Sequence, residues 1–332
     1  MPSPDASVVI PTHNRRESLR RVLEALDHQT VDGSRFEVIV VCDGCTDGTA
    51  EMCKRLTTRY ALRVEEQAQQ GPAAARNAAL ARAAGDVVVF IDDDVLPDPG
   101  LLEQHLAAQA EDPDVVAIGP LLAPPGFALE PWTRWEAAML EDQYRAMASG
   151  RWQPTPRQFY TGNASVRRAH LVEAGGFDTG FRRAEDVELA YRLQINRLHF
   201  RFLPEARGWH YARRSLRSWQ STARAYGEAD VAMYRRGRLM TLQSMASEFR
   251  WRNRRLRALA RMSVGRPAVM AVVVGTSVAA ARLAGWTGLR SVAQSAYSAA
   301  FNLLYWEGVS SRLGGRKEFW RLVETGHGPA PG

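Results

Sequence analysis

The sequence predicts an α/β protein built on a mostly parallel sheet, followed by a helical C-terminal extension. In the first half, short apolar segments alternate with segments of helical periodicity, as they do in parallel sheets flanked by helices. Residues 87–91 are apolar at every position, which is expected for a strand buried on both faces. Beyond residue 215 the alternation ends and helical patterns prevail.

The first half can be assigned element by element. Leu19, Val22 and Leu23 recur at the spacing of one helix face. Gly85 follows an alanine-rich segment at the position where glycine commonly ends a helix. The predicted elements in chain order are strand 7–11, helix 15–29, strand 36–42, helix 46–60, helix 73–84 and strand 87–91. Because parallel strands end at one edge of an open sheet, we expect a ligand site there.

The middle of the chain is less regular, and the last third is helical. Residues 160–166 alternate between apolar and polar side chains, as a half-buried strand does. The elements expected here are a loop at 120–131, helix 132–148, a loop at 149–156, strand 160–166, a helix from about 185, strand 200–203 and helices from 215 to about 313.

Charge is distributed unevenly along the 332 residues. The formal net charge is +7, but between Val231 and Trp306 the only acidic residue is Glu248. Such a basic region indicates an anionic partner, such as a membrane surface or nucleic acid. Residues 267–281 form an apolar run that falls short of the roughly 20 residues needed to span a bilayer. A buried or interfacial helix is therefore expected there.

The cysteines and the N-terminus favour a cytoplasmic protein. Cys42, Cys45 and Cys53 lie within twelve residues of one another, which argues against a disulfide framework and for reduced thiols. A redox role for the Cys42-x-x-Cys45 pair is the alternative. Residues 8–10 form too short an apolar run for a signal peptide.

The buried strand at residues 87–91 ends in three carboxylates, Asp92, Asp93 and Asp94. Three like charges at the tip of a strand repel one another, and a divalent cation would relieve that repulsion. Mg²⁺ and Mn²⁺ take oxygen ligands and commonly bind through one or two carboxylates together with substrate phosphates. A solvated acidic turn is the alternative. Neither Gly-x-Gly-x-x-Gly nor a Walker-type motif occurs, which excludes the usual phosphate loops of Rossmann dehydrogenases and P-loop NTPases.

Four ordered motifs resemble those of family 2 glycosyltransferases, which are inverting enzymes of the GT-A fold. The resemblance covers residues 7–215. The motifs are Val8-Val9-Ile10-Pro11-Thr12-His13-Asn14-Arg15, Val40-Val41-Cys42-Asp43-Gly44-Cys45-Thr46-Asp47-Gly48-Thr49, Gly71-Pro72-Ala73-Ala74-Ala75-Arg76-Asn77 and Phe90-Ile91-Asp92-Asp93-Asp94. The second motif departs from the family's Asp-Asp-Gly-Ser, because Cys42 and Cys45 replace its first Asp and its Ser.

The resemblance implies a role for each motif residue. Asp43 would accept a hydrogen bond from the nucleotide base, which favours uracil or thymine, and Asp94 would bind the metal directly. Without the resemblance, Thr12 and Asn14 read equally well as turn and capping residues. The implied nucleotide-sugar-binding residues are Pro11, Thr12, Asn14, Asp43, Arg76, Asp92, Asp93, Asn163 and Glu185, and the implied metal ligands are Asp94, Asp92 and His210.

The second half would supply the catalytic base. Glu185 and Asp186 open a predicted helix, where simple N-terminal capping is the alternative. The family places its general base in such a pair, and we assign that role to Asp186, with Glu185 touching the acceptor or the donor sugar. For His210, metal ligation and a structural hydrogen bond stay open, and Asn163 fits either a sugar pocket or packing.

The sequence thus predicts an inverting, metal-dependent hexosyltransferase that uses Mn²⁺ or Mg²⁺. It would move a sugar from a UDP or dTDP sugar to an acceptor hydroxyl, in glycan, glycolipid or natural-product glycoside synthesis. One alternative is a sugar nucleotidyltransferase, but such an enzyme would have a glycine- and arginine-rich loop after the first strand, and this sequence has none there. The other alternative is a non-catalytic binding module.

The predicted domain division follows the resemblance. Residues 1–119 would bind the nucleotide sugar and residues 120–215 the acceptor, and together they would form the catalytic domain. Residues 216–332 would form the helical extension. Aromatic and arginine residues mix within 247–285, which favours peripheral contact with the inner face of the cell membrane. A solvated helix packed on the catalytic domain is the alternative, and no reader motif for nucleic acid accompanies the charge.

Overall fold

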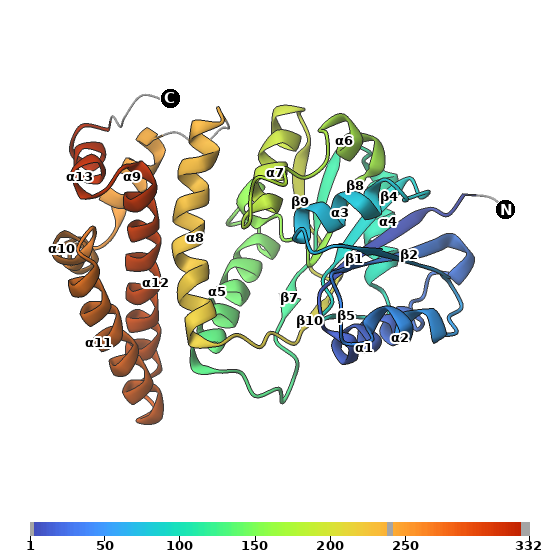
Figure 1. Ribbon diagram of the computed structural model, residues 1–332, viewed down its shortest axis with the longest axis horizontal. Helices are drawn as coiled ribbons and strands as arrows, with labels where there is room; N and C mark the ends of the chain where they lie inside the picture. Colours follow the sequence, from blue (N-terminus) through green and yellow to red (C-terminus); the bar gives the residue numbers. More distant parts are fainter. Residues whose placement is uncertain (1–2, 238–241, 327–332) are drawn as a thin grey trace. The chain divides into compact units, whose positions relative to one another are not determined.

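A computed structural model describes residues 3–237 and 242–326 (Figure 1). The chain divides into two compact units. The sheet unit comprises the residues up to 128 together with 137–212, and the helical unit comprises 129–136 together with the residues from 213 onward. The roles predicted for residues 1–215 and 216–332 stay predictions.

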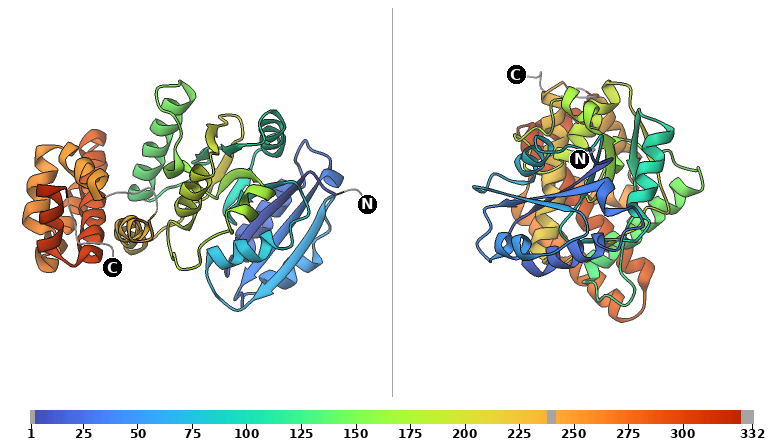
Figure 2. Two further views of the ribbon diagram at one scale, coloured as in Figure 1. Left: turned by 90° about the horizontal axis from the view of Figure 1, so that it is seen from above. Right: turned by 90° about the vertical axis from the view of Figure 1, so that its right-hand side faces the viewer.

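Within the described residues, the sheet unit has a seven-stranded sheet of order β3-β2-β1-β4-β8-β6-β9. Neighbouring strands are parallel, except that β8 runs antiparallel to both β4 and β6. Figure 2 shows these strands from two further directions. The strands are β1 (Ala6–Thr12), β2 (Phe36–Asp43), β3 (Ala61–Gln67), β4 (Val87–Ile91), β6 (Val115–Ile118), β8 (Asn163–Arg167) and β9 (His199–Phe202). The mostly parallel α/β sheet predicted from the sequence is confirmed.

Helices cover both faces of this sheet, because successive strand residues point to opposite sides. Val8 and Ile10 of β1 pack in one core cluster, and Val9 packs in the other. The first cluster receives side chains from α1 (Arg16–Leu26), α2 (Thr49–Arg55) and α4 (Leu101–Glu111). The second receives them from α3 (Pro72–Leu80), α6 (Arg168–Glu173) and α7 (Glu185–Ile195). Burial on both faces explains the apolar run of β4.

A second sheet of three short strands begins in the chain shortly after β4 ends. It consists of β5 (Val95–Pro97), β10 (Gly208–His210) and β7 (Leu121–Leu122). Antiparallel pairing of β10 with β5 sets His210 opposite Val95, the residue after the triple Asp. This pairing joins positions that lie more than one hundred residues apart in the sequence.

Several elements were not predicted from the sequence, and the helices predicted at 15–29, 46–60 and 73–84 are shorter in the structure. The helix predicted at 46–60 ends at Arg55, and the chain continues into β3. β3 is an edge strand with alternating half-buried and exposed residues, among them Arg63 and Glu65, so it lacks an apolar run. The other unpredicted elements are α4, β6, α6, the helix α13 (Arg316–Thr325), the small sheet and the 3₁₀ turns Gly33–Arg35 and Pro156–Gln158.

The helical unit is formed by long helices and an aromatic core. Trp219, Phe249, Trp306 and Phe319 are almost fully buried. The helices α8 (Leu216–Arg235) and α12 (Arg290–Leu313) approach closely at glycines: a Cβ on Gly227 would lie 2.0 Å from the Tyr305 carbonyl oxygen. The helices are α8 (Leu216–Arg235), α9 (Leu242–Trp251), α10 (Arg254–Ser263), α11 (Pro267–Trp286), α12 (Arg290–Leu313) and α13 (Arg316–Thr325), and α5 (Pro131–Ala148) contributes its first turn. The predicted helical character of the C-terminal region is confirmed.

Helices α10 and α11 differ in the faces that they expose. Leu256 and Ala260, on the apolar side of α10, are buried, so its exposed side is mainly basic. By length and composition, the 20-residue helix α11 could cross a membrane, with a mean hydropathy of 1.7. The sequence-based expectation that this segment is too short is therefore corrected: the helix continues past the apolar run as far as Trp286. Membrane contact through 247–285 stays a prediction.

Candidate active site

The ends of strands β1 and β4 meet at one edge of the sheet, as the strand–helix alternation predicts. Thr12, the last residue of β1, donates a hydrogen bond from Oγ1 to Oδ2 of Asp93 at 2.7 Å. Both side chains are largely buried. Burial raises the pKa of Asp93 to about 7, although Arg15 opposes this shift. Thr12 is therefore a partner of the triple Asp and more than a turn residue.

Arg15 and His210 converge on Asp94. The Arg15 Nη1 atom donates to Asp94 Oδ2 at 2.6 Å and lies 3.7 Å from Asp93 Oδ1. On the other side, His210 Nε2 lies 3.4 Å from Asp94 Oδ1. Burial alone would raise the pKa of Asp94, but His210 and Arg15 outweigh it and hold that pKa below its usual value. Asp94 is thus an ionised carboxylate with cationic or hydrogen-bonding groups on both oxygens.

Arg76 connects the strand tip to the Glu185-Asp186 pair. Its Nη2 atom donates to Asp92 Oδ1 at 2.9 Å, and its Nη1 atom donates to Glu185 Oε1 at 2.9 Å. The guanidinium is buried, and its Nε atom has no hydrogen-bond partner among the described residues. Burial would lower the pKa of Arg76, but Asp92 and Glu185 outweigh it and raise the pKa. One buried cation therefore holds the two predicted acidic segments together.

Asp186 lies in the first turn of α7, and the residue that precedes this helix has an unusual backbone conformation. Ala184, directly before the helix, has φ 57°, in the left-handed region that a residue with a side chain seldom adopts. Asp186 accepts a hydrogen bond from the Val187 amide at 2.8 Å, a local bond that leaves its second oxygen without a described partner. Burial, with repulsion from Glu185, raises the pKa of Asp186 to about 7. A carboxylate with that pKa is matched to proton transfer at neutral pH.

The remaining predicted nucleotide residues lie at the ends of β1 and β2 or in the loop after β1. Asp43 accepts hydrogen bonds from the Gln70 and Gly71 amides at 2.8 and 2.7 Å, so its carboxylate fixes the loop before α3. Asn14 has φ 53° and accepts from the Thr46 amide at 2.7 Å. Pro11 is half-buried at the end of β1. Base recognition by Asp43 stays a prediction.

Asn163 is enclosed by protein. It is fully buried, and its Nδ2 atom donates to the Pro120 and Ala206 carbonyl oxygens at 2.9 and 2.7 Å. Its Oδ1 atom lies 2.9 Å from Nε2 of buried His105. Burial lowers the pKa of His105 to about 4. These contacts favour packing for Asn163 over a place in the sugar pocket.

The donor set suits a divalent cation held by few protein ligands. In the part of the chain that the structure describes, no group of three or more His, Cys, Asp or Glu side chains is disposed to hold a metal ion. Asp94 and His210 do lie together, and one carboxylate oxygen with one imidazole nitrogen suits Mn²⁺ when substrate phosphates supply the other ligands. Asp92 instead bonds to Arg76, so its metal role stays a prediction.

Arg15 is the site residue to which the sequence assigned no role. It belongs to the first motif, yet only the folded chain brings its side chain to Asp93 and Asp94. A signal was available, because Arg15 is a basic residue at the end of the first motif, four positions after the predicted strand 7–11. The bridging role of Arg76 between Asp92 and Glu185 also needed the fold.

Comparison with known proteins identifies the family. The model of Glycosyl transferase family 2 matches residues 7–184. Glycosyltransferase AglE of Haloferax volcanii is 36% identical over 31% of this chain and 35% of its own length. The pre-mycofactocin glycosyltransferase of Mycobacterium tuberculosis is 30% identical over 67% of this chain and 46% of its own length. The chain thus spans only about a third to a half of these curated relatives.

Solved structures share the fold. TarS of S. aureus, in complex with UDP-GlcNAc, has a TM-score of 0.58 at 19% identity and covers 94% of this chain and 92% of its own. The mannosyltransferase PcManGT of Pyrobaculum calidifontis, in complex with GDP-Man and Mn²⁺, has a TM-score of 0.58 at 21% identity, covering 91% and 88%. The GT-A fold prediction is confirmed. By its sequence match over more than half of its length, the chain belongs to glycosyl transferase family 2.

Proposed function

We propose that this protein transfers a sugar from a nucleoside-diphosphate sugar to an acceptor hydroxyl, with inversion at the anomeric carbon. The observation that carries the proposal is the Arg76 bridge, which ties Asp92 at the strand tip to Glu185, the neighbour of Asp186. The bridge supports the proposal because it joins the strand tip, where the donor would bind, to the residue directly before the candidate base. The nucleotide sugars in the TarS and PcManGT structures support a donor of this class.

Asp186 would act as the general base. As the acceptor oxygen forms its bond to the anomeric carbon, the bond from that carbon to the diphosphate breaks on the opposite face, and Asp186 takes the proton of the acceptor hydroxyl. Arg76 would hold the Glu185 carboxylate in position for contact with the sugar, through the 2.9 Å hydrogen bond. The raised pKa of Asp186 supports this role, because a stronger base takes the proton more readily.

Asp94 and His210 would hold a divalent cation, Mn²⁺ or Mg²⁺, which supplies charge neutralisation for the leaving diphosphate. Without a bound donor, the Arg15 guanidinium forms ion pairs with Asp94 and Asp93. We propose that its guanidinium moves to the diphosphate when the donor binds, since phosphate oxygens offer it a bidentate partner. Thr12 would keep Asp93 in place through the 2.7 Å hydrogen bond.

The donor base is proposed to be uracil or thymine. Pro11, Thr12 and Asn14 would line the nucleoside pocket. Asp43 would need to exchange one of its present amide partners for the base N3–H. The GDP-mannose complex of PcManGT makes guanine the competing choice.

Thermal unfolding with UDP, dTDP, GDP and CDP, each with and without Mn²⁺, tests the donor site. A ligand at one hundred times its dissociation constant adds about 2.7 kcal/mol to the free energy of unfolding. We expect a manganese-dependent shift with UDP or dTDP. A shift with GDP alone would overturn the base assignment, and no shift with any nucleotide would overturn the proposed function.

A further inference from the structure

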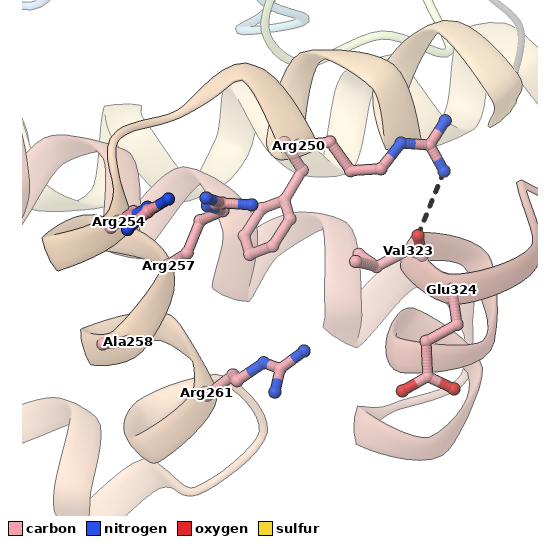
Figure 3. Close-up of a pocket in the computed structure, with 8 residues that line it drawn as sticks. Arg250, Arg254, Arg257, Ala258, Arg261, Val323 and Glu324 are labelled. Carbon is pink, nitrogen blue, oxygen red and sulfur yellow. Dashed lines mark hydrogen bonds between the residues drawn. The ribbon is translucent and has the colours of Figure 1, made fainter.

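A pocket with several arginines lies within the helical unit, between α9, α10 and α13 (Figure 3). Its volume is about 460 Å³, which is within the range of small-molecule sites. Phe249, Ala258 and Val323 supply its apolar surface. The lining residues are Phe249, Arg250, Arg254, Arg257, Ala258, Arg261, Val323 and Glu324. The pocket uses none of the residues proposed for the active site.

The charge of this pocket is unbalanced. Four arginines line it against one carboxylate, that of Glu324. Among the described residues, none of the four arginines forms an ion pair. Arg254, Arg257 and Arg261 recur at the spacing of one face of α10, where like charges destabilise a helix. A bound anion would relieve this repulsion between the arginines.

The individual arginines are positioned by the surrounding helices. Arg250 donates from Nη1 to the Val323 carbonyl oxygen at 3.2 Å, which ties α9 to α13. Arg261 lies over the Trp320 ring, 5.7 Å from its centroid. The Nε atom of Arg257 is buried without a hydrogen-bond partner among the described residues. In Figure 3, Arg261 and Glu324 extend into the space between α10 and α13.

We propose that this pocket binds a phosphate-bearing anion. Guanidinium groups match phosphate oxygens in bidentate geometry, and two or more of them at one pocket provide more positive charge than a single carboxylate requires. The apolar surface formed by Phe249 and Val323 leaves room for the uncharged part of a phosphate ester next to the charged group.

Two sources could supply this phosphate: the headgroup of an anionic lipid, or a soluble phosphorylated molecule. Exposed apolar side chains belong to the same unit as the pocket. Trp251, directly after Arg250, is 86% exposed, and Trp286 and Val272 of α11 are 85% and 65% exposed. Arginines beside exposed tryptophan are typical of helices that lie in a membrane interface.

Binding experiments with two probes separate these sources. Titration calorimetry with inorganic tripolyphosphate tests a soluble ligand, and co-sedimentation with phosphatidylglycerol vesicles tests a lipid headgroup, both with the full-length protein. We expect the variant Arg257→Gln/Arg261→Gln to bind the favoured probe at least tenfold more weakly, since each charge-assisted bond to phosphate is strong. The matched control is Arg255→Gln/Arg290→Gln, which removes the same charge from exposed positions outside the pocket.

The single carboxylate provides a test in the opposite direction. Glu324→Gln removes the only negative charge among the described residues that line the pocket, so we expect severalfold tighter binding. Glu228→Gln, an exposed position on α8, is its control and should leave the affinity within twofold.

Binding of tripolyphosphate supports a soluble ligand, and binding of vesicles without tripolyphosphate supports a lipid headgroup. Each result must be weakened by the pocket variant and preserved by its control. Binding to neither probe, or equal loss in the pocket variant and the control, would overturn the proposal. Circular dichroism and thermal unfolding of each variant verify that it is folded.

Discussion

The two units differ in how their charged side chains are paired. In the sheet unit, carboxylates pair with cations: buried Arg76 bonds to Asp92 and Glu185, and the partly exposed Arg15 bonds to Asp94. In the helical unit, Arg254, Arg257 and Arg261 share one pocket with a single carboxylate. Paired charges can exchange partners when a ligand binds, whereas arginines without an ion pair need the ligand as their partner. The following variants test the paired charges of the sheet unit.

The largest effect is expected at Asp186. Asp186→Asn keeps the size of the side chain and the acceptor for the Val187 amide, but it removes the base. We expect the turnover rate to fall by about 10²–10⁴-fold while the nucleotide-induced thermal shift persists. Rate measurements at saturating donor check this, with Asp142→Asn, an exposed carboxylate on α5, as control. Undiminished turnover in Asp186→Asn would reassign the base.

Removal of the Arg76 cation should be the most destabilising change. Arg76→Gln leaves Asp92 and Glu185 without their shared buried partner, and loss of one member of a buried pair costs about 3–5 kcal/mol. Chemical denaturation measures the free energy of unfolding. Arg82→Gln breaks an exposed pair with Glu65, so less than about 1 kcal/mol should be lost there. Similar losses at both positions would contradict the bridging role of Arg76.

The Arg15 contact should limit metal affinity in the absence of donor. Arg15→Gln frees one oxygen of Asp94, so we expect Mn²⁺ to bind the free protein severalfold more tightly. The nucleoside diphosphate should bind more weakly, because a phosphate partner is lost. Calorimetry with each ligand distinguishes the two effects, and Arg16→Gln, whose side chain is exposed, is the control. Weaker Mn²⁺ binding in Arg15→Gln would show that Arg15 does not compete with the metal.

The smallest effect is a pH dependence. Burial raises the pKa of Asp186 to about 7, and only its ionised form is a base. The ratio kcat/KM should therefore increase up to about pH 7 and be constant above it. Because the pKa is higher in the folded state, ionisation of Asp186 lowers stability as the pH rises from about 4 toward 7. Relative to wild type, Asp186→Asn should gain stability across that window, as thermal unfolding at several pH values can show.

The sequence predicted the parts of the molecule that local patterns determine. The apolar run of β4 predicted a buried strand, which the structure contains, and its terminal carboxylates predicted a candidate site at its end. The edge strand β3 was not predicted, because its solvent-facing side chains interrupt any apolar run. The small sheet escaped because three short segments, distant in sequence, form it only after the chain has folded.

Pairing between distant residues was the part of the site that local patterns could not reveal. Only the family resemblance predicted that Asp92 and Glu185 belong to the same site. In the structure, hydrogen bonds from Arg76 to both carboxylates hold them together. Asn163 shows the reverse case. The sequence left a sugar pocket and packing equally open for it, and three buried hydrogen bonds occupy its amide.

The most direct test is hydrolysis of a donor panel in the presence of Mn²⁺, with water in place of the unidentified acceptor. Nuclear magnetic resonance follows the anomeric form of the sugar released from UDP, dTDP and GDP sugars. We predict slow release of a nucleoside diphosphate together with a sugar of inverted anomeric configuration, and loss of this release in Asp186→Asn. A sugar released with retained configuration, or release that Asp186→Asn leaves unchanged, would contradict the inverting mechanism proposed for this site.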